Sequence, residues 1–153
     1  ELEDEAEIIL LDTSAGLNKE AITVMEASDE VLVITNPELS AVLDAQKALQ
    51  LAQELGKTIL GVVINKQGEH RQELKVNEVE KLLDLPVIGV IPYDTAVREA
   101  LKLKHPVTLS HPKSKASKSY EELAGLLLGK SYFESINKKG GSLYDYVLKG
   151  LGF

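Results

Sequence analysis

The segment that decides the fold reads Glu7-Ile8-Ile9-Leu10-Leu11-Asp12-Thr13-Ser14-Ala15-Gly16-Leu17. Its unbroken apolar run is typical of a strand that is covered on both faces, as strands of parallel sheets are. The run ends at Asp12, and open α/β sheets bind their ligands at the carboxyl edge. We therefore expect Asp12 to hold the water shell of a phosphate-bound magnesium ion, and Gly16 to let the backbone approach that phosphate. The residues alone leave open that Asp12 only caps the next helix.

Composition places the chain among ordinary globular proteins. Its 153 residues, 44% hydrophobic and 27% charged, suffice for one domain. The net charge of −7 argues against nucleic acid as a partner. Without cysteine and with scattered histidines, these residues supply no thiolate metal site and no iron–sulfur scaffold. No apolar run approaches the roughly 20 residues that span a bilayer, and the acidic start is unlike a signal peptide, so we expect a cytoplasmic protein.

Helical and strand patterns alternate along the chain, which predicts the crossover units of a parallel sheet. The predicted strands are Ile8–Asp12, Val31–Asn36, Thr58–Asn65 and Pro86–Pro92. The predicted helices are Lys19–Ala27, Ser40–Leu55, Val76–Leu83, Thr95–Leu103 and Ser117–Leu128. A core-facing stripe is predicted on the second helix by the spacing of Val42, Ala45, Leu49 and Ala52. The fold class is therefore α/β, with a partial doubly wound parallel sheet.

Right-handed crossovers bring the ends of parallel strands to one edge of the sheet. We expect this edge to gather the polar residues Asp12, Asn36 and Asn65 with Pro92-Tyr93-Asp94. The amide of Asn65 offers a donor and an acceptor to a purine, and Pro92 with Val97 offers an apolar wall for a base. Turn formation is the alternative role of both Asn65 and Pro92.

Four segments in this order resemble the MinD/ParA family of deviant-Walker P-loop ATPases, and MinD most closely. They are Asp12-Thr13-Ser14-Ala15-Gly16-Leu17, Thr35-Asn36-Pro37-Glu38-Leu39-Ser40, Val63-Ile64-Asn65-Lys66 and Val90-Ile91-Pro92-Tyr93-Asp94. The resemblance extends over roughly Glu7 to Gly129, and includes His105-Pro106-Val107 and Pro112-Lys113-Ser114. Each motif alone is weak, and the set together is specific.

The resemblance implies a P-loop NTPase fold with ATP and Mg²⁺ as cofactors. It gives Asp12 the role of holding magnesium through water, and Gly16 that of facing the γ-phosphate. The residues that it places around adenine are Asn65, Pro92, Tyr93, Asp94 and Val97. It places Glu38–Asp44 near surfaces that change with nucleotide state. It further implies a homodimer in the ATP state, a regulatory or division protein as partner, and a role in spatial regulation such as placement of the division site.

Two features depart from the family pattern. Ser14 stands where the family usually has proline. No segment matches the Gly-Lys-rich phosphate loop, and Lys138-Lys139-Gly140-Gly141-Ser142 lacks both its glycine-lysine-serine end and a preceding strand. We therefore expect residues 1–129 to be the carboxyl-terminal part of a MinD-like ATPase domain, and a proteolysed product or a partner-dependent half domain stays open as an alternative. By itself this chain should bind nucleotide poorly and hydrolyse nothing, since phosphate cradling supplies most of phosphoryl-transfer catalysis.

Residues 130–153 read as a linker and a carboxyl-terminal amphipathic tail. On a helix, one face would carry Leu143, Tyr144, Val147, Leu148 and Leu151. Such a segment, which follows two lysines and a glycine pair, suits a peripheral and reversible contact with an anionic membrane, and MinD proteins end in a similar helix. The alternative is a terminal helix that packs on its own domain or on a dimer partner.

Three other functions remain open at this point. The chain could be a nucleotide-free interaction module that keeps the fold without ATPase activity. It could be a ParA-like DNA segregation ATPase, which would require a basic surface. A flavodoxin-like receiver or binding domain would also place acidic residues at strand ends, but does not explain the motifs at Asn65 and Pro92. The residues Lys113, Lys115 and Lys118 either contact a partner or face solvent, and a lysine run of this kind favours a solvated face.

Overall fold

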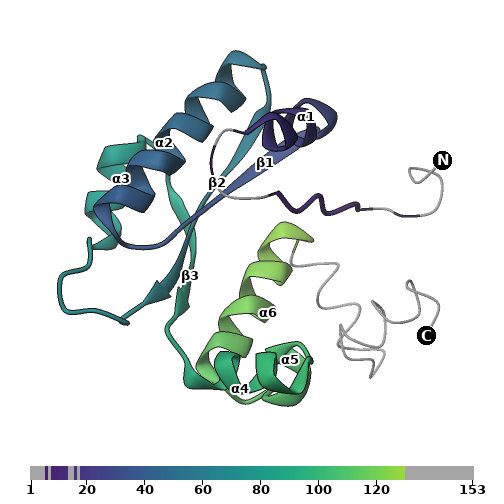
Figure 1. The fold of residues 1–153 in the computed structure, drawn as a ribbon, viewed down its shortest axis with the longest axis vertical. Helices are drawn as coiled ribbons and strands as arrows, with labels where there is room; N and C mark the ends of the chain where they lie inside the picture. Colours follow the sequence, from purple (N-terminus) through teal and green to yellow (C-terminus); the bar gives the residue numbers. More distant parts are fainter. Residues whose placement is uncertain (1–5, 7, 14–15, 17, 130–153) are drawn as a thin grey trace. The chain divides into compact units, whose positions relative to one another are not determined.

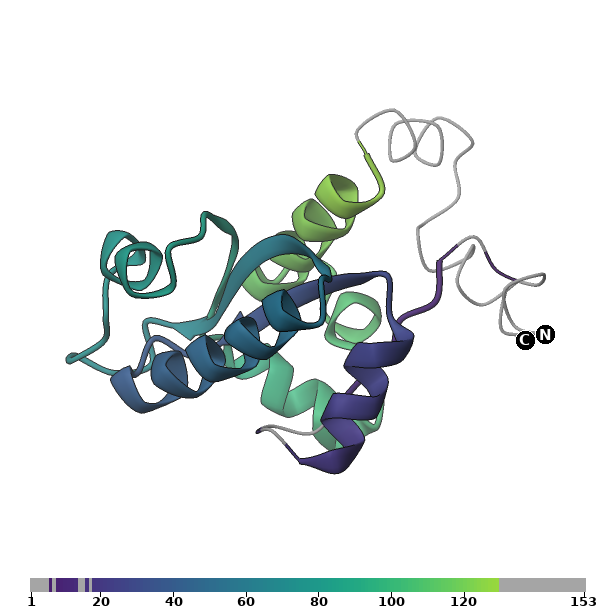
Figure 2. The same ribbon diagram turned by 90° about the horizontal axis from the view of Figure 1, so that it is seen from above.

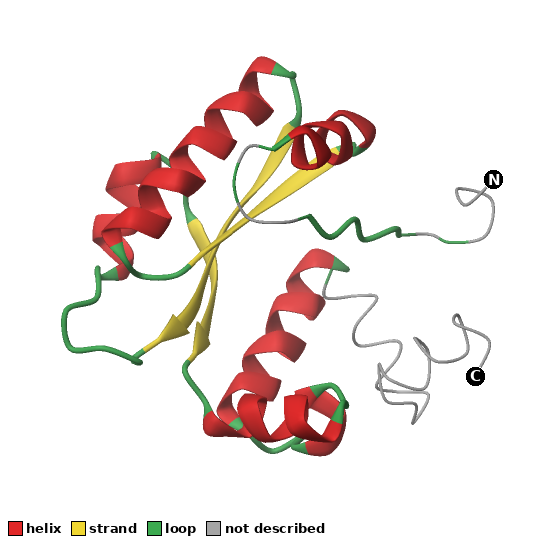
Figure 3. Cartoon of the chain, viewed as in Figure 1, coloured by secondary structure: helices red, strands yellow, loops and turns green. Residues whose placement is uncertain are grey.

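The structure of the protein is a computed structural model, and it describes residues 6, 8–13, 16 and 18–129. This part of the chain contains three strands, β1 (Glu30–Thr35), β2 (Thr58–Gln67) and β3 (Val87–Pro92). Its helices are α1 (Lys19–Ala27), α2 (Leu39–Glu54), α3 (Val76–Leu83), α4 (Thr95–Leu103), α5 (Val107–Ser110) and α6 (Lys115–Leu127) (Figures 1 and 3). The described residues form two compact units, Leu10–Asp94 and the described residues outside that range.

The unit Leu10–Asp94 is built on a parallel sheet of strand order β1-β2-β3. The central strand β2 pairs with β1 on one side and with β3 on the other. Its consecutive side chains Val62, Val63 and Ile64 are at most 1% exposed, so both of its faces are covered at this point. A continuous apolar run is what such a strand requires, because alternate side chains point to opposite faces.

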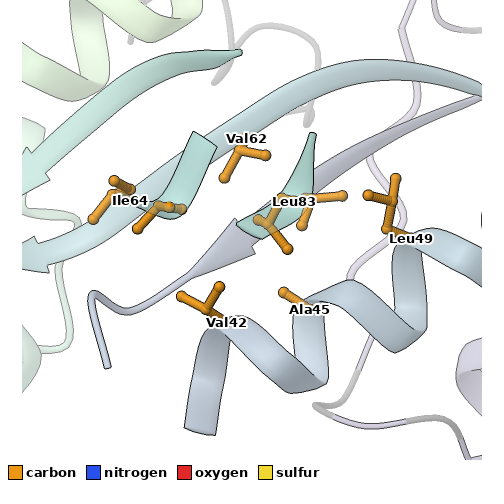
Figure 4. Packing of buried hydrophobic residues seen from close by; sticks show 8 residues of the cluster. Val42, Ala45, Leu49, Val62, Ile64 and Leu83 are labelled. Carbon is orange, nitrogen blue, oxygen red and sulfur yellow. The ribbon is translucent and has the colours of Figure 1, made fainter. Parts of the chain in front are cut away.

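The core of this unit lies between one face of the sheet and the helices α2 and α3. The predicted stripe on α2 is confirmed, since Val42, Ala45 and Leu49 pack into one cluster with strand and α3 side chains (Figure 4). Its other members are Val33, Val62, Ile64, Val79 and Leu83. Figure 2 shows α2 running alongside the strands. Full burial of each valine or leucine side chain contributes about 1.5–3 kcal/mol, so this cluster is the main stabilising feature of the unit.

Two polar side chains fix the ends of α1. The Asn18 side-chain oxygen accepts a hydrogen bond from the Ala21 amide at 2.8 Å, which satisfies a free donor at the start of the helix. At the other end, the Lys57 ammonium group donates to the carbonyl oxygens of Glu26 at 2.7 Å and Ser28 at 2.8 Å. A cation at these carbonyls is favoured by the helix dipole, and it ties α1 to the start of β2.

In the second unit, a buried hydroxyl group joins α5 to α6. The Ser117 hydroxyl lies 3.0 Å from the Val107 carbonyl oxygen and 2.7 Å from that of His111, and it accepts from the Ser114 hydroxyl at 2.9 Å. Ser114 also caps α6 by accepting from the Ser117 amide, which is why this helix begins before the predicted Ser117. The single-turn helix α5 was not predicted.

One predicted strand is wrong. The structure assigns no strand to Ile8–Asp12, and the side chains of Ile8, Ile9, Leu10 and Leu11 are 40–88% exposed. The boundary between the two units also falls between Ile9 and Leu10. An apolar run indicates that a segment can be buried, but a strand forms only where a neighbour pairs with its backbone. In the described part of the chain, the ladders join β1, β2 and β3 alone.

The other predicted elements are confirmed within two residues at each end. The α/β class and the parallel sheet are confirmed with them. The predicted carboxyl-terminal helix lies outside the described residues. Among those residues, no helix is both long enough and apolar enough to cross a membrane.

Gly61 gives a test of the sheet packing. Its φ is +139°, and a Cβ atom there would lie 2.7 Å from the Ile88 Cγ2 atom. We expect Gly61→Ala to lower the free energy of unfolding of the full-length gene product by at least about 2 kcal/mol, because a steric conflict of about 1–3 kcal/mol adds to backbone strain of similar size. Chemical denaturation measures the change.

Gly56→Ala is the matched control. Gly56 also has a positive φ of +68°, but a Cβ atom there would meet nothing within 4 Å. This variant should lose only about 1–2 kcal/mol, which is the cost of the left-handed backbone. Equal losses in the two variants would show that the contact with Ile88 is not the cause.

Candidate functional site

The carboxyl ends of the three strands meet at one edge of the sheet. Thr35 at the end of β1 pairs with Ile64 of β2, and Gln67 at the end of β2 pairs with Pro92 of β3. Asn36 directly follows β1. The predicted edge of Asp12, Asn36, Asn65 and Pro92-Tyr93-Asp94 is therefore confirmed for the residues that follow the three strands, and not for Asp12.

A β-bulge interrupts the pairing at this edge. Between Ile64 and Gln67, β2 advances three residues while β3 advances two, from Val90 to Pro92. The extra length lies at Asn65 and Lys66, and Lys66 has the left-handed φ of +59°. The Asn65 Oδ1 atom accepts from the Lys66 amide at 3.0 Å, which leaves its NH₂ group as the donor that this contact does not use. Bulges of this kind re-aim a side chain, and they are common beside binding sites.

The loop after β2 is closed by the carboxylate of Glu73. Its Oε2 atom accepts from the Gly68 amide at 2.6 Å and from the Gln67 Nε2 atom at 2.7 Å. Its Oε1 atom accepts from the His70 amide at 2.7 Å. Hydrogen bonds to a carboxylate are about twice as strong as those between neutral groups, so the Glu73 side chain stabilises the conformation of this loop.

The same loop joins all three strand ends. The Leu74 amide donates to the carbonyl oxygen of Pro37, two residues beyond β1, at 2.8 Å. The carbonyl oxygen of Gln67, at the end of β2, accepts from the Tyr93 amide just after β3 at 2.8 Å. Since Glu73 holds the Gln67 side chain and precedes Leu74, the network connects the segments that follow β1, β2 and β3.

The protonation of Glu73 reflects these contacts. Burial raises the pKa of its carboxyl group, but hydrogen bonds from the amides of His70, Gly68 and Glu69 and from the Gln67 side chain outweigh this effect and hold the pKa below its ordinary value. Glu73 is therefore ionised at neutral pH. Glu73 was not predicted from the sequence, because a carboxylate six residues beyond the strand matches no helix or strand period. Gly68 was the local signal of a turn.

The remaining predicted residues come from several segments of the chain. Asp12 is exposed and lies in the segment that has no strand pairing among the described residues. Gly16 has a φ of +90°, a conformation that suits glycine. Tyr93 and Asp94 directly follow β3, whereas Val97 lies on α4 in the other unit. The five apolar tail residues lie outside the described range. Within that range, no group of three or more His, Cys, Asp or Glu side chains could hold a metal ion.

Comparison with known proteins gives the family. The protein-family model described as ParA, NUBPL iron-transfer P-loop NTPase, matches residues 3–128 of this chain. An uncharacterised ATP-binding protein of Methanocaldococcus jannaschii is 35% identical over 150 residues, which are 98% of this chain and 57% of that protein.

Solved structures agree with this result. The crystal structure of the cell division ATPase MinD of Pyrococcus furiosus aligns with a TM-score of 0.75 and 33% identity, over 82% of this chain and 54% of that one. The septum site-determining protein MinD of Pyrococcus horikoshii, complexed with Mg-ADP, aligns with a TM-score of 0.72 and 29% identity, over 76% and 48% of the two chains. This chain thus spans about half the length of the relatives that it matches.

The fold is that of an α/β protein with a parallel sheet. The chain belongs to the ParA family of P-loop NTPases, and it is related to MinD. The family resemblance predicted from the four sequence motifs is confirmed.

The Glu73 contacts predict a titration. Because the pKa of Glu73 is lowered in the folded state, its contribution to loop stability is present above the ordinary glutamate pKa and is lost as the pH falls through the lowered value. We expect the backbone amide resonances of Gly68 and His70 to move together in NMR spectra, with a midpoint below that of an exposed glutamate. The movement should be absent in Glu73→Gln. Resonances that titrate with an ordinary glutamate midpoint would contradict the hydrogen-bonded arrangement.

Proposed function

We propose that this chain belongs to a MinD-like ATPase, in which ATP binding and hydrolysis drive dimerisation and membrane association for spatial regulation such as placement of the division site. The observation that carries the proposal is the convergence of Asn65 and Pro92 at one sheet edge. It is supported by the similarity to a MinD structure complexed with Mg-ADP. In this reading, residues 1–129 are the carboxyl-terminal part of the ATPase domain and residues 130–153 are the linker and tail.

The residues divide into a base side and a phosphate side. On the base side, the amide of Asn65 would bond to the purine edge, and Pro92, Tyr93, Asp94 and Val97 would enclose the ring. On the phosphate side, the exposed Asp12 carboxylate is a hard oxygen donor that suits Mg²⁺. A single carboxylate such as that of Asp12 fits a magnesium ion held through water, because such an ion retains most of its own hydration. Magnesium would neutralise phosphate charge, and Gly16 would admit the phosphate close to the backbone.

A partner surface is proposed on the first turns of α2. Leu39 and Leu43 lie four residues apart on this helix, and their side chains are 55% and 42% exposed. Residues at this spacing share one face of a helix. This apolar pair, within Glu38–Asp44, is suited to a second copy of the chain in the ATP state or to a regulatory or division protein.

The first experiment uses the full-length gene product. We expect it to bind Mg-ATP in calorimetry and to release phosphate. Asp12→Asn should reduce the rate of hydrolysis about 100-fold, which is the usual effect of removing one group that stabilises transition-state charge. Asp29→Asn removes a carboxylate that is also exposed, just before β1, and should leave the rate unchanged. Equal rates for the wild type and Asp12→Asn would contradict the role of Asp12, whereas a full-length protein that binds no nucleotide would favour an interaction module.

The membrane tail is tested with vesicles that contain anionic lipid. Leu148→Glu removes a predicted buried side chain, worth about 1.5–3 kcal/mol, and should reduce recruitment of the full-length protein more than about tenfold. Lys149→Gln changes the net charge by the same single unit on the predicted polar face. It should lose only about 1 kcal/mol of binding. If Leu148→Glu is recruited as well as the wild type, the tail packs on protein instead.

A further inference from the structure

We propose that Glu73 is a positioning residue, which acts through Gln67 to hold the carboxyl ends of β2 and β3 in the arrangement that reads the base of a bound nucleotide. The inference rests on the proposed nucleotide-binding function of the edge. It adds a residue that contacts neither the base nor the phosphates, and whose effect is on the choice between bases.

The geometry of the bulge sets the direction of the Asn65 side chain. Asn65 and Lys66 leave the regular β2–β3 ladder, and pairing resumes at Gln67 opposite Pro92. The direction of the Asn65 side chain therefore depends on how the chain is held on the far side of the bulge. Lys66 has a left-handed backbone, which a residue with a side chain adopts only when its surroundings impose it.

The contacts of Gln67 impose this backbone. Gln67 is held at two points, by its carbonyl oxygen, which accepts from the Tyr93 amide, and by its side-chain Nε2, which donates to Glu73. The carboxylate also fixes which way the Gln67 amide faces, because only the NH₂ end can donate to it. The Oε1 end is buried and accepts no hydrogen bond in the described part of the chain, so the contact with Glu73 sets the orientation of this amide.

Only a carboxylate at position 73 can accept all of these hydrogen bonds. Two oxygen atoms of Glu73 serve several donors, among them the Gly68 amide, the His70 amide and Gln67 Nε2. A glutamine at this position has one carbonyl oxygen, and its NH₂ group would face a donor. Glu73→Gln therefore breaks at least one of the three contacts while it keeps the size of the side chain.

The Glu73 network lies at the base side of the proposed nucleotide site and not at the phosphate side. Through Gln67 the network reaches Pro92 and Tyr93, and Asn65 lies in the bulge directly before Gln67, all at the predicted base side. Asp12 and Gly16 lie outside it. A loosened network should thus weaken the discrimination between adenine and guanine, while the binding of phosphate groups is unchanged.

The test measures the dissociation constants of Mg-ADP, Mg-GDP and magnesium pyrophosphate for the full-length gene product by calorimetry. The quantity of interest is the ratio of the GDP constant to the ADP constant. We expect Glu73→Gln to lower this ratio at least fivefold and to leave pyrophosphate binding unchanged. Gln67→Met should lower it similarly, and the double variant should lower it no further than either single one, because both act through one contact.

Glu78→Gln is the matched control. The Glu78 carboxylate also accepts from a backbone amide, that of Lys75 at 2.7 Å, but at the start of α3 and not at the strand ends. This variant should lose stability without a change in the ratio. If Glu73→Gln does not fold, as judged by circular dichroism, Gln67→Met carries the test.

The possible outcomes are distinct. A ratio that falls in Glu73→Gln and Gln67→Met but not in Glu78→Gln supports the positioning role. An unchanged ratio in the first two variants, or an equal fall in all three, overturns that role while the proposed function stands. A wild-type protein that binds neither nucleotide overturns both.

Discussion

Parallel pairing of β1 and β3 with the central strand β2 is the constraint on which the rest of the described structure depends. It requires β2 to be apolar on both faces, and Val62, Val63 and Ile64 meet this requirement. It requires the connections to cross over the sheet, which places α2 and α3 against the core. It also brings the segments after the three strands to one edge, where Asn36, Asn65 and Pro92 meet without any sequence proximity.

The edge departs from regular pairing only beyond the buried part of β2. The bulge at Asn65 and Lys66 follows directly after Ile64, so it leaves the ladder of the core intact. Beyond it, backbone amides that a sheet would pair are satisfied by the Glu73 carboxylate. Hydrogen bonds to a charged acceptor are stronger than those to a neutral one, and this carboxylate accepts several of them at once. One side chain thereby replaces the ladder where the backbone must change direction.

Sequence reasoning predicted the elements whose signals are local. The spacing of Val42, Ala45 and Leu49 specified the buried face of α2, and the apolar runs specified β1, β2 and β3. The run at Ile8–Asp12 carried the same signal and is not a strand in this structure, because pairing depends on a distant neighbour and not on the run itself. The bulge and the role of Glu73 also escaped prediction. Both depend on which strand lies opposite Gln67, and no periodicity encodes that information.

The two sides of the proposed nucleotide site differ in how far the described residues organise them. On the base side, hydrogen bonds already connect the segments after β1, β2 and β3, so little ordering should remain to be done when a base binds. On the phosphate side, Asp12 is exposed in a segment without strand pairing. A ligand that joins the two sides must supply the free energy that orders the second. Under the proposed function, the base would thus set which nucleotide binds, and the phosphates would determine the conformational state of the Asp12 segment.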